Sequence, residues 1–160
     1  MKYLTVGFSE HKGILSWLIK KSTNSPCSHT YIRYPSGDEH IVFQASKISV
    51  NTCNWRYFQE KNKIVEEYSV EISDEQFAYA QRFCSEEVGK PYSVKQLVGF
   101  LWVIAMHAIG RKVSNPLADG DHSFVCAEVV AECIGLENPE SLTQEDVRRW
   151  CAKYGYRLLS

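Results

Sequence analysis

Cys126 stands where a cysteine can act as a nucleophile. A polar loop, residues 119–123, precedes it, and residues 125–134 form an apolar run that favours a helix. The thiolate is the reactive form of cysteine, and both a helix N-terminus and a neighbouring histidine lower the pKa of a thiol. The position of Cys126 therefore predicts a nucleophile that attacks a carbonyl carbon and forms a thioester.

His29 is the base that we expect to act on this thiol. It lies near the start of residues 28–34, which are rich in β-branched and aromatic side chains, and a Pro-containing loop precedes it. A histidine at such a position can point from the edge of a sheet into a cleft. Gln44 lies on the next expected strand, residues 39–45, where its side-chain oxygen can accept the ring N–H and orient the imidazole. The turn between the strands leaves the register of Gln44 open.

Four short motifs, taken in chain order, resemble a known enzyme family. They are Ser28-His29-Thr30-Tyr31-Ile32, Phe43-Gln44-Ala45-Ser46, Gly89-Lys90-Pro91-Tyr92 and Ser123-Phe124-Val125-Cys126-Ala127-Glu128-Val129-Val130. Their order and spacing resemble the circularly permuted branch of the NlpC-type papain-like cysteine peptidases and amidases, to which the bacterial YiiX-like proteins belong. The likeness runs from about Trp17 to Ile134. In the unpermuted relatives the cysteine helix comes first, whereas here the histidine strand precedes it.

The resemblance implies an α+β fold, a small antiparallel sheet or half-barrel packed with helices, and hydrolysis of an amide bond through a thioester. The substrate would be a peptide, cell-wall stem peptides included, or an acyl amide. Cys126 would be the nucleophile, His29 the base and Gln44 the residue that orients the base. Tyr92 would bind the oxyanion or the substrate together with the backbone N–H of Cys126. The chain has Cys126-Ala127-Glu128 where the family often has Cys-Ser-Glu.

Other chemistry remains open for some of the same residues. Cys27 is a rival nucleophile and His122 a rival base, whereas Cys133, one heptad after Cys126, is expected in the core. Cys27, His29, His122 and Cys126 also supply the four nitrogen and sulfur ligands of a structural zinc site. No Cys-x2-Cys pair supports that site, so we expect neither a metal nor an organic cofactor.

Two further functions are compatible with the same fold. Residues 97–109 are strongly apolar, so the protein could be a thioesterase or acyltransferase that acts on lipid-like acyl substrates. A non-catalytic binding or structural protein is the second alternative. The apolar segment is shorter than the roughly 20 residues needed to cross a bilayer, so a membrane span is not predicted, although shallow membrane contact stays open.

Composition limits the classes of function. The 160 residues are 44% hydrophobic and 23% charged, which fits one catalytic domain over residues 1–160. A net charge of −1 offers no basic surface for a phosphate backbone, so we expect no nucleic-acid partner. The six cysteines are dispersed and the N-terminus does not resemble a signal peptide. We therefore expect free thiols and a cytoplasmic protein, released or injected if phage-encoded. Nothing indicates its oligomeric state.

The elements that position these residues follow from hydrophobic periodicity and capping signals. Strands are expected over residues 2–8, 28–34, 39–45 and 64–72, with the second and third as a hairpin. Helices are expected over residues 11–21, 74–88, 94–109, 125–134 and 143–154, with His11 at the start of the first. Residues 110–121 form a polar connection. The neighbouring carboxylates Glu66-Glu67 and Glu86-Glu87 are expected on solvated faces rather than as acid/base pairs.

Overall fold

The fold is α+β, with one antiparallel sheet packed against helices. The computed structural model describes residues 1–36, 38–46, 49–91, 98–99, 102, 106, 109–111, 113 and 126–158. Six strands pair in the order β4-β3-β2-β1-β5-β6. Their bounds are β1 (Lys2–Glu10), β2 (His29–Ser36), β3 (Glu39–Ser46), β4 (Ser49–Asn54), β5 (Lys63–Ile72) and β6 (Tyr156–Leu158). The expected fold class is confirmed.

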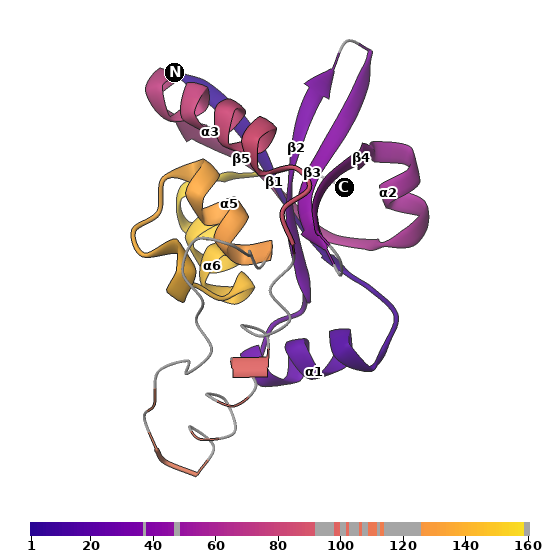
Figure 1. Ribbon diagram of the computed structural model, residues 1–160, viewed down its shortest axis with the longest axis vertical. Coiled ribbons are helices and arrows are strands. Elements are labelled where there is room, and N and C mark those ends of the chain that lie inside the picture. The colour runs from indigo at the N-terminus through magenta and orange to yellow at the C-terminus, as the bar shows by residue number, and fades with distance from the viewer. Residues whose placement is uncertain are drawn as a thin grey trace.

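Helices cover both faces of the sheet (Figure 1). On one face lie α3 (Asp74–Glu87), α5 (Cys126–Ile134) and α6 (Gln144–Tyr154), with the short 3-10 helix η1 (Pro139–Ser141) between the last two. On the other face lies α2 (Trp55–Lys61). The remaining helix, α1 (Ile14–Thr23), connects β1 to β2 and therefore lies near the end of the sheet where β2 begins. No helix formed by the described residues is long and apolar enough to cross a membrane.

Side-chain alternation along β2 and β3 divides the core into two parts. Ile32, Phe43 and Ala45 belong to the larger core that α5 completes. Tyr31 and Val42 point to the opposite face, where they pack against Phe58 of α2. Because side chains alternate along a strand, His29 and Gln44 are directed to the α2 face, and α5 approaches from the other side.

Capping residues account for the helix ends near the site. Ser73 accepts a 3.0 Å hydrogen bond from the backbone N–H of Gln76 at the start of α3, as its position predicted. Gly135 follows α5 with φ of 74°, a left-handed conformation that favours glycine. The side chain of Gln76 donates to the carbonyl oxygens of Glu132 and Cys133 at 2.8 and 3.1 Å. A residue of α3 thus supplies hydrogen-bond donors to the last carbonyl groups of α5.

Several elements differ from the expectation. β4, α2 and β6 were not expected, because the first is short and largely polar, the second has seven residues and the third has three. Helix α1 begins at Ile14, with Gly13 as its N-cap, rather than at His11. Ile14 is 81% exposed, so the apolar face expected for this helix is only partly used in packing. The helix expected over residues 94–109 and the connection over 110–121 lie outside the described residues, apart from isolated positions.

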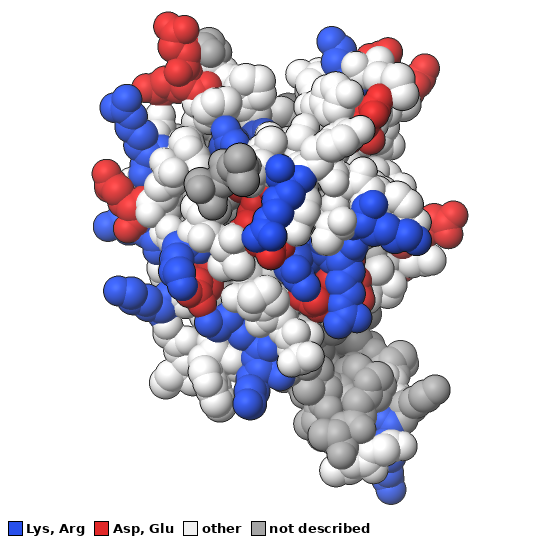
Figure 2. Space-filling model, turned by 180° about the vertical axis from the view of Figure 1, so that it is seen from behind, with Lys and Arg blue, Asp and Glu red and all other residues white. Residues whose placement is uncertain are grey.

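The paired glutamates of β5 are not on solvated faces. Glu67 is 7% exposed and accepts hydrogen bonds from Arg33 at 2.9 and 3.0 Å. Glu66 points to the opposite face and accepts one from Arg148 at 3.2 Å. Both faces of β5 are covered, because α6 packs on one and α2 on the other, so each carboxylate needs a cation. Across the face seen in Figure 2, acidic and basic side chains are interspersed.

Candidate functional site

Cys126 is the first residue of α5, and its side chain is almost entirely shielded from solvent. The residue is 8% exposed, and burial raises the pKa of its thiol. Backbone N–H groups of Thr30, Ala127 and Cys126 itself act on the sulfur and oppose this rise. The expected lowering of the thiol pKa is therefore wrong for this structure, because desolvation outweighs the N–H groups at the helix start. Cys126 rests as a thiol at neutral pH.

His29 is the first residue of β2 and is half-buried. Its ring lies 6.3 Å from the ring of Phe58, centroid to centroid, on the α2 face. Burial lowers the pKa of His29 to about 4, the hydrogen bond to Gln44 opposes that change, and nearby His11 adds a small repulsion. The imidazole is therefore neutral at pH 7, and a neutral imidazole can accept a proton.

A chain of hydrogen bonds determines which ring nitrogen of His29 carries the proton. Asn51 donates through Nδ2 to the Ser49 carbonyl oxygen at 2.8 Å, and a carbonyl can only accept. The Oδ1 of Asn51 therefore faces Gln44 and accepts from its Nε2 at 3.2 Å. This leaves Oε1 of Gln44 as the atom that faces His29, at 2.7 Å from Nε2. Nε2 thus donates its proton to Gln44, and Nδ1 is the free basic nitrogen.

One cavity brings the three residues together. It has a volume of about 490 Å³, and His29, Gln44 and Cys126 all line it. Cys126 and His29 are far apart in the chain but converge because α5 packs against β2 and β3. Ile14, Ile19, Ala45 and Tyr57 supply apolar parts of the wall. The expected contact between Gln44 and His29 is present, whereas Tyr92 lies outside the described residues.

The rival residues differ in their surroundings. Cys27 has no solvent exposure, belongs to the main core and has its pKa raised to about 11, first of all by burial. Cys133 is also fully buried in the core, as expected. His122, which the zinc assignment needs, lies outside the described residues. Among the residues that the structure does describe, no group of three or more His, Cys, Asp or Glu side chains is placed to hold a metal ion.

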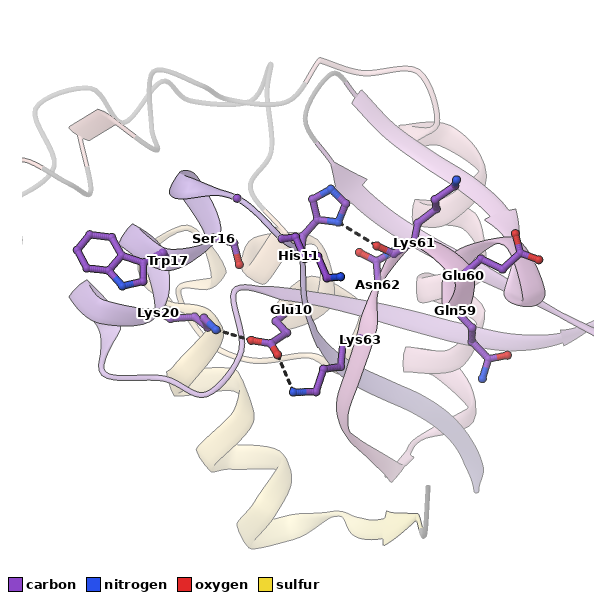
Figure 3. Close-up of a pocket in the computed structure, with 12 residues that line it drawn as sticks. Glu10, His11, Ser16, Trp17, Lys20, Gln59, Glu60, Lys61, Asn62 and Lys63 are labelled. Atoms are coloured by element: carbon purple, nitrogen blue, oxygen red, sulfur yellow. Dashed lines mark hydrogen bonds and ion pairs between the residues drawn. The ribbon is translucent and has the colours of Figure 1, made fainter.

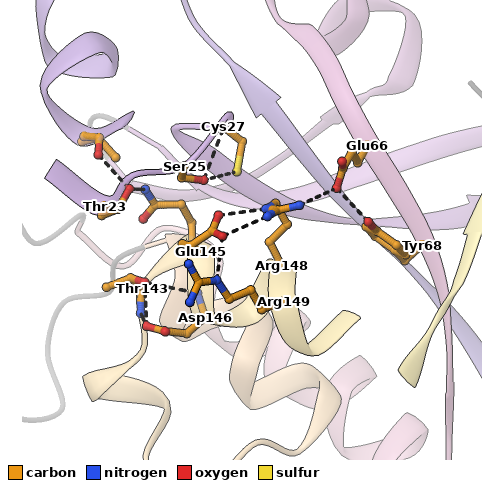
Figure 4. Close-up of polar contacts among 12 residues, drawn as sticks. Thr23, Ser25, Cys27, Glu66, Tyr68, Thr143, Glu145, Asp146, Arg148 and Arg149 are labelled. Atoms are coloured by element: carbon orange, nitrogen blue, oxygen red, sulfur yellow. Dashed lines mark hydrogen bonds and ion pairs between the residues drawn. The ribbon is translucent and has the colours of Figure 1, made fainter. Parts of the chain in front are cut away.

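Helix α6 anchors the segment that leads into His29 (Figure 4). Glu145 is 5% exposed, and its pKa is lowered to about 2, above all by its hydrogen bonds from Arg148 and also by one from Ser25. Ser25 in turn contacts the sulfur of Cys27 at 3.2 Å. The residue before Glu145, Gln144, donates a hydrogen bond from its side-chain amide to the hydroxyl oxygen of Thr23 at 2.8 Å. The sequence indicated only a helix start at these positions.

A second contact ties α1 to the residue before the base. Ser16 and Ser28 are both buried, and their hydroxyl oxygens lie 2.6 Å apart. The ring of His11 donates from Nδ1 to the carbonyl oxygen of Lys61 at 3.0 Å, which ties the loop before α1 to the end of α2 (Figure 3). His29 is therefore held from α1, α2 and α6, although none of these contacts is local in sequence.

Comparison with known proteins supports the fold alone. No protein-family model matches the chain, and no curated protein matches it. Among solved structures, it is similar to one described as the metalloprotein yiiX from Escherichia coli O157:H7, with a TM-score of 0.58 and 18% identity. The match covers 98% of this chain and 95% of that one. The α+β fold of this chain is therefore YiiX-like.

Proposed function

We propose that the protein is a cysteine-nucleophile hydrolase that cleaves an amide bond, in a peptide or an acyl amide, through a thioester. The observation that carries the proposal is one cavity lined by Cys126, by His29 and by Gln44, which is hydrogen bonded to the His29 ring. Its components are those of a nucleophile, a base and an orienting group. The likeness of the four sequence motifs to papain-like amidases supports the same assignment.

The reaction begins with the neutral form of His29. Its Nδ1 takes the proton of the Cys126 thiol as the sulfur attacks the carbonyl carbon, so a C–S bond forms and the carbonyl becomes an oxyanion. The backbone N–H of Cys126 and the side chain of Tyr92 are the proposed oxyanion donors. The protonated imidazole returns its proton to the leaving amine as the C–N bond breaks. Water, deprotonated by His29, then hydrolyses the thioester.

The protonation states favour this concerted transfer over a preformed ion pair. Burial raises the pKa of Cys126 and lowers that of His29, so both shifts favour the uncharged pair before substrate binds. The base form of His29 is available above its pKa of about 4. Activity should therefore persist into mildly acidic solution, where an unperturbed histidine would be protonated.

A thioesterase or acyltransferase is the second candidate, because the same cavity has an apolar wall. Ile14, Ile19 and Tyr57 line it beside Cys126 and suit a hydrocarbon chain. Turnover of long-chain thioesters without cleavage of any peptide or acyl amide would favour this candidate. Turnover of acyl amides would favour the first.

Trapping of the acyl-enzyme tests the proposal. A library of acyl amides and peptides is incubated with the protein and quenched in acid, and intact mass and peptide mapping locate any acyl adduct. We expect a hydroxylamine-labile adduct on Cys126 that is absent in Cys126→Ser and strongly reduced in His29→Ala. Cys84→Ser is the matched control, because Cys84 is partly exposed, does not line the cavity and contacts Tyr34 and Cys133 rather than a site residue. Adducts spread over several cysteines, or turnover retained by Cys126→Ser, would contradict the assignment.

A further inference from the structure

A second cavity lies beside the one that holds Cys126. It has a volume of about 780 Å³ and lies between α1 and the end of α2 (Figure 3). The two cavities share six lining residues, which are His11, Lys12, Gly13, Ser16, Lys61 and Asn62. The two cavities are therefore adjacent, and a ligand that occupied both would contact these shared residues.

The second cavity is basic, although the chain as a whole is not. Its lining includes four lysines, Lys12, Lys20, Lys61 and Lys63, and two glutamates, Glu10 and Glu60. The lining thus has two more positive than negative charges, whereas the whole chain has a net charge of −1. The lining of this cavity is therefore basic in net charge.

One carboxylate is shared by two of the lysines. Glu10 contacts Lys20 and also Lys63, the second at 2.8 Å, and Figure 3 shows it between them. Glu10 is 22% exposed at its side chain, and these two hydrogen bonds lower its pKa. Among the described residues Lys12 and Lys61 form no ion pair, and Lys61 lies 5.9 Å from the ring of Tyr57. The lining therefore contains two lysines that share one carboxylate and two lysines without an ion-pair partner among the described residues.

We propose that this cavity binds an anionic oxygen group of the substrate, a carboxylate or a phosphate, while the carbonyl to be attacked lies at Cys126. This inference rests on the proposed function and names the substrate class for it. Ammonium groups act as point charges and do not impose the two-pronged geometry of arginine, so either anion suits them. An anion here relieves the mutual repulsion of the lysines, and its distance from the thiol sets how long the acyl part must be.

Matched fluorogenic esters test the inference. The hemisuccinate, hemiglutarate and hemiadipate of 4-methylumbelliferone each differ from the butyrate, pentanoate and hexanoate by a carboxylate in place of a methyl group. Rates with Cys126→Ser are subtracted as background. We expect at least one acidic ester to have a kcat/KM about threefold to tenfold above its neutral partner, a ratio that falls as salt is added.

Single substitutions then assign the preference to this cavity. Lys12→Gln and Lys61→Gln should each reduce the ratio of acidic to neutral kcat/KM about threefold. Glu10→Gln should raise it, because it removes the negative charge that Lys20 and Lys63 share. Lys21→Gln is the matched control, since Lys21 is an exposed lysine of α1 outside both cavities and its loss should leave the ratio unchanged. Equal loss in the control would overturn the inference.

Binding without turnover separates the two claims. Glutarate and inorganic phosphate are titrated calorimetrically into the wild-type chain and into Lys12→Gln, and the tighter ligand identifies the anion class. If esters are hydrolysed through Cys126 with no acidic preference, the subsite is wrong and the hydrolase stands. If no ester reacts but an anion binds in a Lys12-dependent way, the subsite stands and the hydrolase is wrong. If neither occurs, both are wrong.

Discussion

The Gln44→Glu variant offers the sharpest test of the site, because it places a negative charge on a known contact. Oε1 of Gln44 lies 2.7 Å from Nε2 of His29, so a carboxylate there is about 4 Å from the centre of the ring charge. At that distance two unit charges interact by about 4 kcal/mol at an effective dielectric constant of 20, or about three pKa units. His29 is half-buried, and solvent should reduce this to about two units.

The pKa of His29 should therefore rise from about 4 to about 6 in Gln44→Glu. At pH 5 the neutral base would fall from about nine-tenths of the protein to about one-tenth, so kcat/KM should drop about tenfold. At pH 8 both proteins have neutral His29, and this effect on rate should vanish. The assay is a proton-carbon NMR titration of the His29 ring, which needs no substrate, together with the pH profile of kcat/KM.

The control adds the same charge elsewhere. Gln81 is exposed on α3, on the opposite face of the sheet, so Gln81→Glu should leave the pKa of His29 within a few tenths of a unit. A wild-type His29 that titrates above pH 6 would refute the argument that burial depresses this pKa. So would a Gln44→Glu shift no larger than that of the control, since it would mean that the side chain of residue 44 does not contact the ring.

Three further substitutions test how the site is supported. Asn51→Leu removes the acceptor that orients Gln44, so the His29 ring should populate both tautomers and kcat should fall about tenfold. The nitrogen-15 shifts of the ring report the tautomers, and unchanged shifts would contradict the hydrogen-bond chain. Glu145→Gln should lower the free energy of unfolding by roughly 2 kcal/mol at pH 7. The Glu145 pKa is lowered from 4.5 to about 2, so its contribution is complete above pH 4.5 and is lost as the pH falls toward 2; a pH-independent difference in urea unfolding would refute this. Gly7→Ala should lower the free energy of unfolding by more than about 2 kcal/mol, because the new Cβ would overlap the Tyr31 ring that packs on Phe58. A variant as stable as wild type would show that this packing is loose.

The positions of the three site residues could be predicted because each depends on a local signal. Cys126 begins a helix after a polar stretch of sequence, His29 begins a strand after a proline, and Gln44 lies on the second strand of a hairpin. Strand alternation then places His29 and Gln44 on one face. Whether these residues catalyse a reaction remains a prediction.

The supporting contacts and the pKa values could not be predicted in this way. Glu145 reaches Ser25 and Gln76 reaches the end of α5 across long stretches of chain, and neither motif differs from an ordinary helix start. The direction of the Cys126 shift depends on how much protein covers the sulfur, which only tertiary packing determines. The basic cavity could not be predicted either. Its lysines come from α1, α2 and β5 and their flanking residues, and the net charge of the chain is close to zero.

The order of the elements has a consequence for biosynthesis. Strands β1 to β5 are contiguous between residues 2 and 72, so His29 and Gln44 can reach their places while the rest of the chain is still being made. Cys126, the proposed nucleophile, is more than fifty residues further on, and at about 5–20 residues per second it emerges from the ribosome several seconds later. A nascent chain therefore contains His29 and Gln44 before Cys126, and the proposed site is complete only after α5 has docked.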